Sequence, residues 1–88
     1  MEVELHRNAC KHLSEDDVLH AWGTMSICIR RESDDEPPRW LGIGWLEDGS
    51  SVELIAVELM NGWLIIHANA PVQSKFAKEI ERARRRAR

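Results

Sequence analysis

Apolar residues in the first part of the chain recur at helical spacing. Residues 2–22 are predicted to be helical, with a break near residue 12 and a new start at Ser14. Ser14 supplies a hydroxyl that can cap a helix, and the acidic residues after it favour the positive end of the helix dipole. Val18 and Trp22 then lie four apart on one helical face. We therefore expect two short helices, the second of which covers a sheet.

The pattern changes to the two-residue period of β-strands at Met25. Two turn signals, Asp48-Gly49 and Asn61-Gly62, are typical of tight hairpins and separate the last three apolar runs. The predicted strands are Met25–Ile29, Trp40–Leu46, Ser51–Met60 and Trp63–Ala68, with an acidic loop at Arg30–Pro38. Hairpin-length turns make the last three strands pair antiparallel, as a meander.

The residues from Gln73 onward have the composition of an exposed helix. Two helices, four antiparallel strands and one helix define an α+β domain, with the helices packed against one face of the sheet. The last helix is expected to dock through Phe76 and Ile80 and to extend to about Arg82. Residues 83–88 are expected to fray unless nucleic acid or an acidic partner neutralises their arginines.

Length and composition are those of one folded domain. The chain has 88 residues, of which 43% are hydrophobic and 31% charged, so a single domain at 1–88 with a structured core at about 3–82 is expected. Its apolar stretches are far shorter than a membrane span, and no export signal is visible. A cytoplasmic protein without membrane contact is therefore expected, with Cys10 and Cys28 as free, packed thiols.

The formal net charge of −3 hides an asymmetry along the chain. Residues 1–60 carry 5 basic and 13 acidic side chains, whereas residues 61–88 carry 7 basic and 2 acidic ones. The basic part is a candidate surface for phosphates or for an acidic partner. The candidate nucleic-acid or partner-binding residues there are Lys78, Arg82, Arg84, Arg85 and Arg86.

Most motifs of metabolic enzymes are absent from the sequence. It has no phosphate-binding glycine loop, dinucleotide fingerprint, zinc-protease motif or nucleophilic triad. His6, Cys10, His12 and His20 come nearest to a set of metal ligands, but they lack the paired spacing of a structural zinc site. We therefore expect no metal and no cofactor.

Four tryptophans, in a chain with one Phe and no Tyr, fall on predicted helix or strand. They are Trp22, Trp40, Trp45 and Trp63. Packing in the core or at an interface is one interpretation, and a stacking surface for unpaired bases is the other. A surface that stacks nucleic-acid bases usually has basic residues between its aromatic ones. No Lys or Arg lies between Trp40 and Trp63, which favours packing.

His67 is the most promising single residue for chemistry. It follows three consecutive apolar positions at the end of the last predicted strand. Histidine is the side chain best suited to proton transfer near neutral pH, and here it can act as general acid or base beside a phosphate held by Lys75 or Arg82. A purely structural histidine is the alternative.

Three segments together resemble the BrnT-like toxins and their uncharacterised actinobacterial relatives. Lys11–Ala21 is similar to the family's opening, Lys-His-Gly-x-x-x-x-Asp/Glu-hydrophobic-x-x-Ala. Trp40–Gly44 and Val52–Met60 are similar to its central strands. Ile65–Ala68 with Lys75-Phe76 is similar to its ending, Ile-Ile-His-Ala followed by Lys-Phe/Tyr. The spacing of the three segments in one chain is better evidence than any one of them.

The resemblance implies a fold similar to the RelE and ParE toxins. It also implies the activity of a ribonuclease, or descent from one in a degenerate relative, with a cognate antitoxin protein and RNA as partners. A metal-independent ribonuclease needs a base, an acid and cationic groups around the phosphorane. Positions that match the family's motifs offer Lys11, His12, His67 and Lys75 for these catalytic roles.

A function of a different class is also compatible with the sequence. The sheet, hairpins and tryptophans can form the surface of a non-catalytic interaction module. In a homodimer, the basic tail of one chain would lie against the acidic loop of the other. The sequence supports both hypotheses.

Overall fold

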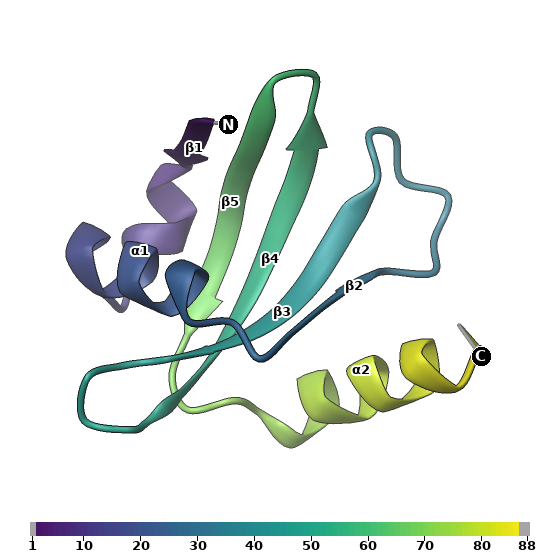
Figure 1. The fold of residues 1–88 in the computed structure, drawn as a ribbon. Coiled ribbons are helices and arrows are strands. Elements are labelled where there is room, and N and C mark those ends of the chain that lie inside the picture. The colour runs from purple at the N-terminus through teal and green to yellow at the C-terminus, as the bar shows by residue number, and fades with distance from the viewer. Residues whose placement is uncertain (1, 87–88) are drawn as a thin grey trace.

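A mixed five-stranded β-sheet organises the chain (Figure 1). The computed structural model describes residues 2–86. Along the chain, the elements are β1 (Glu2–Leu5), the 3-10 helix η1 (Arg7–Cys10), α1 (Glu15–Gly23), β2 (Ile27–Arg30), β3 (Arg39–Trp45), β4 (Ser51–Leu59), β5 (Gly62–Asn69) and α2 (Ser74–Arg86). The order across the sheet is β1-β5-β4-β3-β2. The predicted α+β class is confirmed.

The antiparallel meander from β2 to β5 is also confirmed. Each of these strands pairs antiparallel with the next, although β2 begins at Ile27 rather than at the predicted Met25. In the turn between β3 and β4, Gly49 has a φ of 90°, and the Asp48 carboxylate accepts the Ser50 N–H at 2.9 Å. Both features are those of the Asp-Gly turn that the sequence indicates.

Residues 2–5 form a strand, so the prediction of a helix there is wrong. β1 pairs parallel with β5. Its two glutamates alternate with Val3 and Leu5, which pack against the core. Apolar side chains at every second residue are typical of a strand. Four residues are too few to distinguish this period from a helical one. The sheet consequently has five mixed strands instead of four antiparallel ones.

The N-terminal region contains one α-helix and one 3-10 turn, and the prediction of two helices is corrected accordingly. η1 begins after His6, whose Nδ1 accepts the Asn8 N–H at 3.1 Å. α1 begins after Ser14, as predicted, because the Ser14 hydroxyl accepts the Asp17 N–H at 3.1 Å. Val3 and Leu5 pack against the core from β1 and Ala9 packs from η1, so these residues do not form the apolar face of a second α-helix.

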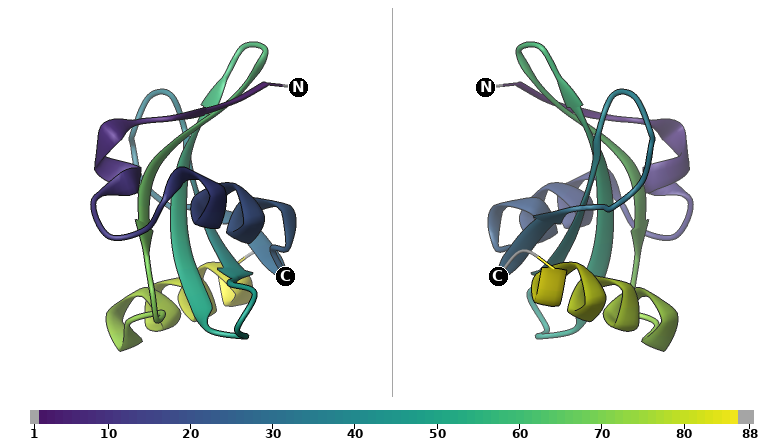
Figure 2. Two further views of the ribbon diagram at one scale, coloured as in Figure 1. Left: turned by 90° about the vertical axis from the view of Figure 1, so that its left-hand side faces the viewer. Right: turned by 90° about the vertical axis from the view of Figure 1, so that its right-hand side faces the viewer.

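Helices cover both faces of the sheet, which corrects the prediction that they pack against one face. α1 and η1 lie on one side and α2 on the other (Figure 2). The reason lies in β4, where Val52 and Leu54 belong to the cluster under α1 and Ile55 packs against the cluster under α2. A strand that is apolar on both faces needs a cover on each.

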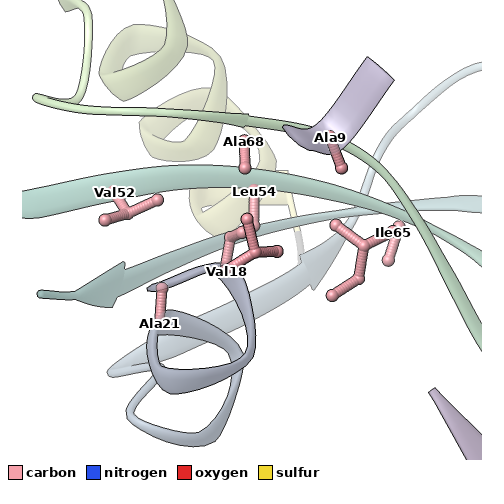
Figure 3. Close-up of a cluster of buried hydrophobic side chains, with 8 residues drawn as sticks. Ala9, Val18, Ala21, Val52, Leu54, Ile65 and Ala68 are labelled. Carbon is pink, nitrogen blue, oxygen red and sulfur yellow. The ribbon is translucent and has the colours of Figure 1, made fainter. Parts of the chain in front are cut away.

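Two hydrophobic clusters fill these interfaces. The first, shown in Figure 3, packs Val18 and Ala21 of α1 and Ala9 of η1 against the sheet. Its sheet residues are Val52, Leu54, Ala56, Ile65 and Ala68. The second joins Phe76 and Ile80 of α2 to Leu41 of β3. The predicted docking of the last helix through Phe76 and Ile80 is therefore confirmed.

α2 remains helical through Arg86, beyond the predicted limit at about Arg82. The fraying of residues 83–88 in isolation stays a prediction, and residues 87 and 88 lie outside the described part of the chain. Across residues 2–86, neither α-helix has the length and apolar character that crossing a bilayer requires.

Candidate active site

A histidine–carboxylate pair lies on the face of the sheet that α2 covers. His67 Nε2 and Glu53 Oε2 are 2.7 Å apart. Glu53 is buried, with 6% of its surface exposed, whereas the His67 side chain is 39% exposed. The other oxygen of Glu53 accepts the Gln73 N–H at 2.8 Å. A buried carboxylate thus orients an imidazole that is open to solvent.

A β-bulge determines which face of the sheet His67 occupies. The register of β4 and β5 shifts by one residue there, and Ile66 has no partner on β4. Because of this extra residue, Ile65 and Ala68 both join the α1-side core although they are three apart. His67 points to the opposite face, where Glu53 accepts its ring N–H.

His67 opens into a groove of about 360 Å³ between the sheet and α2. The residues that line the groove are Arg31, Glu53, Ile55, His67, Gln73, Lys75, Phe76 and Glu79. Two bonds to β4 hold the connection into α2, since the Ser51 hydroxyl accepts the Val72 N–H at 3.1 Å and Glu53 accepts the Gln73 N–H. Lys75, in the first turn of α2, is thereby held at the groove.

The bond to Glu53 decides which ring nitrogen of His67 is free to react. An ionised carboxylate only accepts hydrogen bonds, so His67 Nε2 donates to Glu53. In the neutral ring, Nδ1 then carries a lone pair and no proton. The arrangement presents Nδ1 as a proton acceptor, which is what a general base requires.

The four predicted catalytic residues divide into two pairs. His67 and Lys75 line the same groove. Lys11 is the C-cap of η1 and His12 follows it, and both are exposed in the connection to α1. η1 and α1 cover the opposite face of the sheet (Figure 2). Lys11 and His12 therefore do not line the His67 groove.

The predicted nucleic-acid or partner-binding residues all lie on α2, where several have acidic neighbours. Glu81 lies 4.0 Å from Arg84 and 3.6 Å from Arg85. Arg86 forms an ion pair with Glu32 of the acidic loop. Those without an ion pair to a described residue are Lys78 and Arg82. The acidic loop, proposed above as a contact for another chain's tail, is thus contacted by the tail of its own chain.

The Arg86–Glu32 ion pair is expected to respond to acid. The hydrogen bond from Arg86 holds the pKa of the Glu32 carboxyl below its ordinary value. The pair therefore favours folding above the ordinary glutamate pKa, and this contribution is lost as the pH falls through the lowered pKa. An NMR titration should place the Glu32 midpoint below that of a peptide glutamate. Arg86→Gln should return it to the peptide value, and equal midpoints in both chains would contradict the contact.

Sequence reasoning missed three charged residues of the groove, namely Glu53, Arg31 and Glu79. Glu53 carries a recognisable signal, because it is the one charged residue in the apolar run from Val52 to Val57 and a carboxylate in a buried strand needs partners. Arg31 and Glu79 carry none, since 48 residues separate them and only the docking of α2 brings them together.

The possible metal ligands and the two cysteines form no site of their own within residues 2–86. No three His, Cys, Asp or Glu side chains in that range come together in a way that could hold a metal ion. Cys10 and Cys28 are free thiols, but Cys28 is exposed, which corrects the prediction that both are packed. Partial burial raises the pKa of the Cys28 thiol, so at neutral pH it is largely protonated and a poor nucleophile.

Three tryptophans pack together on the α1 side of the sheet. The ring centroid of Trp63 lies 5.5 Å from that of Trp22 and 5.8 Å from that of Trp40, the latter in an edge-to-face arrangement. Trp40 Nε1 donates to Glu58 at 3.0 Å. Trp22 and Trp63 also pack against the first core cluster, which supports the packing interpretation for these residues.

Comparisons with known proteins give no match, whether with family models, with curated proteins or with solved structures. The fold and the groove alone therefore define the class of molecule. It is a small α+β domain with a five-stranded mixed sheet, helices on both faces and a histidine–carboxylate pair in an open groove.

Proposed function

We propose that the chain is a metal-independent endoribonuclease of the BrnT-like type, acting as the toxin of a type II toxin–antitoxin pair. The observation that carries the proposal is the His67–Glu53 pair, 2.7 Å apart, in a groove that also contains Lys75. RNA cleavage without a metal needs a base, an acid and a cationic group, and His67 and Lys75 together can supply these three roles. The resemblance of three sequence segments to the toxin family supports RNA as the substrate.

The proposed reaction transfers the RNA phosphodiester to its own 2′-oxygen. His67 Nδ1 takes the proton of the 2′-hydroxyl, and the 2′-oxygen forms a bond to phosphorus. The Lys75 ammonium stabilises the phosphorane and gives a proton to the 5′-oxygen as its bond to phosphorus breaks. The products are a 2′,3′-cyclic phosphate and a free 5′-hydroxyl. Solvent returns the proton from His67 to Lys75.

Expression of the chain alone in a bacterial host tests this proposal. It should arrest growth and fragment transcripts, and co-expression of the antitoxin encoded beside it should restore growth. Purified protein should cleave RNA in the presence of a chelator and leave 2′,3′-cyclic phosphate ends. His67→Gln should abolish both effects. Unimpaired growth together with intact RNA would contradict the proposal.

A protein-binding role is the second candidate, and one surface feature favours it. At the end of β4, Met60 is 97% exposed and Leu59 is 36% exposed. They border a cavity of about 240 Å³ together with Glu2 and Glu4. An exposed apolar tip with acidic neighbours is suited to contact a partner. Light scattering across a salt series tests self-association, and a monomer at every concentration and salt would exclude that version.

A further inference from the structure

Arg31 and Glu79 form a second paired group in the His67 groove. Arg31 Nε lies 2.8 Å from Glu79 Oε2, and Arg31 Nη2 lies 3.2 Å from Glu79 Oε1. The guanidinium thus binds both carboxylate oxygens in the bidentate manner that also suits phosphates. The two side chains are 22% and 31% exposed, and both line the groove together with Lys75.

We propose that Arg31 is an oxyanion-binding residue of this groove and that Glu79 occupies its guanidinium until a ligand arrives. The ligand class is the phosphodiester of single-stranded RNA, whose two unesterified oxygens match the guanidinium fork as a carboxylate does. The inference rests on the proposed function, because it assigns a phosphate to the same groove. Glu79 is then an autoinhibitory contact.

The charges of the groove support this assignment. Both oxygens of Glu53 are engaged, one by His67 and one by the Gln73 N–H. The Lys75 side chain is exposed and has no ion pair with another of residues 2–86, so its ammonium is open to a phosphate. Displacement of Glu79 adds Arg31, which offers the planar, two-pronged donor set that Lys75 lacks.

Arg31 is held in place by its backbone, whereas Glu79 has another cation nearby. The Arg31 N–H donates to the Arg39 carbonyl at 2.8 Å, directly beyond the end of β2. Glu79 and Arg82 line a neighbouring cavity, and side chains three apart on a helix are neighbours. Arg82 forms no ion pair with another described residue. A phosphate that displaces Glu79 therefore leaves the carboxylate beside Arg82.

Replacing Glu79 with Gln tests the proposal without requiring cleavage. The probe is a short fluorescein-labelled single strand of 2′-O-methyl RNA, which has no 2′-hydroxyl to attack the phosphate. By fluorescence anisotropy, Glu79→Gln should bind this probe about tenfold more tightly than the unmodified chain.

The matched control is Glu81→Gln, which removes the same charge from the same helix. Glu81 lies beside Arg84 and Arg85 and outside the His67 groove. Because those ion pairs are exposed, the control should change affinity by at most about threefold. Equal gains from the two substitutions would reduce the effect to net charge and overturn the proposal.

Repeating the two substitutions in a chain that carries Arg31→Lys distinguishes binding by the Arg31 guanidinium from a general effect of charge. Arg31→Lys keeps the positive charge and removes the bidentate fork, so in this background Glu79→Gln should gain no more affinity than Glu81→Gln. A tenfold gain that persists with Lys at position 31 would reject Arg31 as the ligand. Thermal unfolding, monitored by tryptophan fluorescence, verifies that each variant is folded. A specific Glu79→Gln gain in a chain that cleaves no RNA would support the anion site while rejecting the ribonuclease proposal.

Discussion

Glu53→Gln is expected to slow RNA cleavage by about a hundredfold or more while leaving the fold intact. The substitution keeps the size of the side chain, and the amide oxygen can still accept the Gln73 N–H that Glu53 accepts at 2.8 Å. The amide nitrogen is a donor and faces His67, which must then accept at Nε2. The ring proton of the neutral imidazole consequently moves to Nδ1, and the base of the proposed reaction is blocked.

Single-turnover cleavage of a fluorogenic RNA measures this effect. Glu58→Gln is the matched control on the same strand, since Glu58 accepts from Trp40 Nε1 at 3.0 Å and lies outside the groove. Its rate should equal that of the unmodified chain. Adding Glu53→Gln to His67→Gln should cost little more, because residues that act as a unit are not additive. An undiminished rate in Glu53→Gln would remove the pair from the mechanism.

The antiparallel part of the fold could be predicted because its signals are local. Asp48-Gly49 and Asn61-Gly62 turn the chain, and Ser14 caps α1, each within a few residues. β1 could not be predicted in this way, since four residues that alternate Glu with Val or Leu are too short to show a period, and their partner β5 lies far along the chain. Helices cover both faces because successive side chains of β4 pack against two different hydrophobic clusters. Since nearly all of these side chains are apolar, the sequence does not show which face each one occupies.

The candidate site, like the fold, could be predicted only where residues close in sequence position it. His67 lies two residues before the end of β5 and Lys75 lies in the first turn of α2, so a short connection keeps them together. Lys11 and His12 are predicted as site residues from the resemblance alone. They follow η1, which packs on the other face of the sheet. The bulge at Ile66, which sets the face of His67, leaves no mark in an uninterrupted apolar run.

Gly44→Ala is expected to destabilise the domain by about 3 kcal/mol. A domain of this size typically has roughly 4–13 kcal/mol of stability, so the loss is a large fraction of the total. An ideal Cβ at position 44 would overlap the Ala21 carbonyl oxygen and lie 2.6 Å from the carbonyl carbon. These are backbone atoms, so no change of rotamer relieves the overlap. α1 must instead move away from β3.

Such a movement of α1 breaks other contacts with β3. His20 Nδ1 and the Thr24 hydroxyl both bond to the Trp45 carbonyl, at 2.8 and 3.2 Å, and both bonds lengthen if the helix shifts. Thermal unfolding followed by tryptophan fluorescence should therefore show a Tm lower by about 12–24 °C for Gly44→Ala. The matched control is Gly23→Ala, at the end of α1, where no atom lies within 4 Å of an ideal Cβ. Because Ala favours helix over Gly, this variant should unfold at an unchanged or slightly higher Tm. If both variants unfolded at the same temperature, the close packing of α1 on Gly44 would not be a determinant of stability.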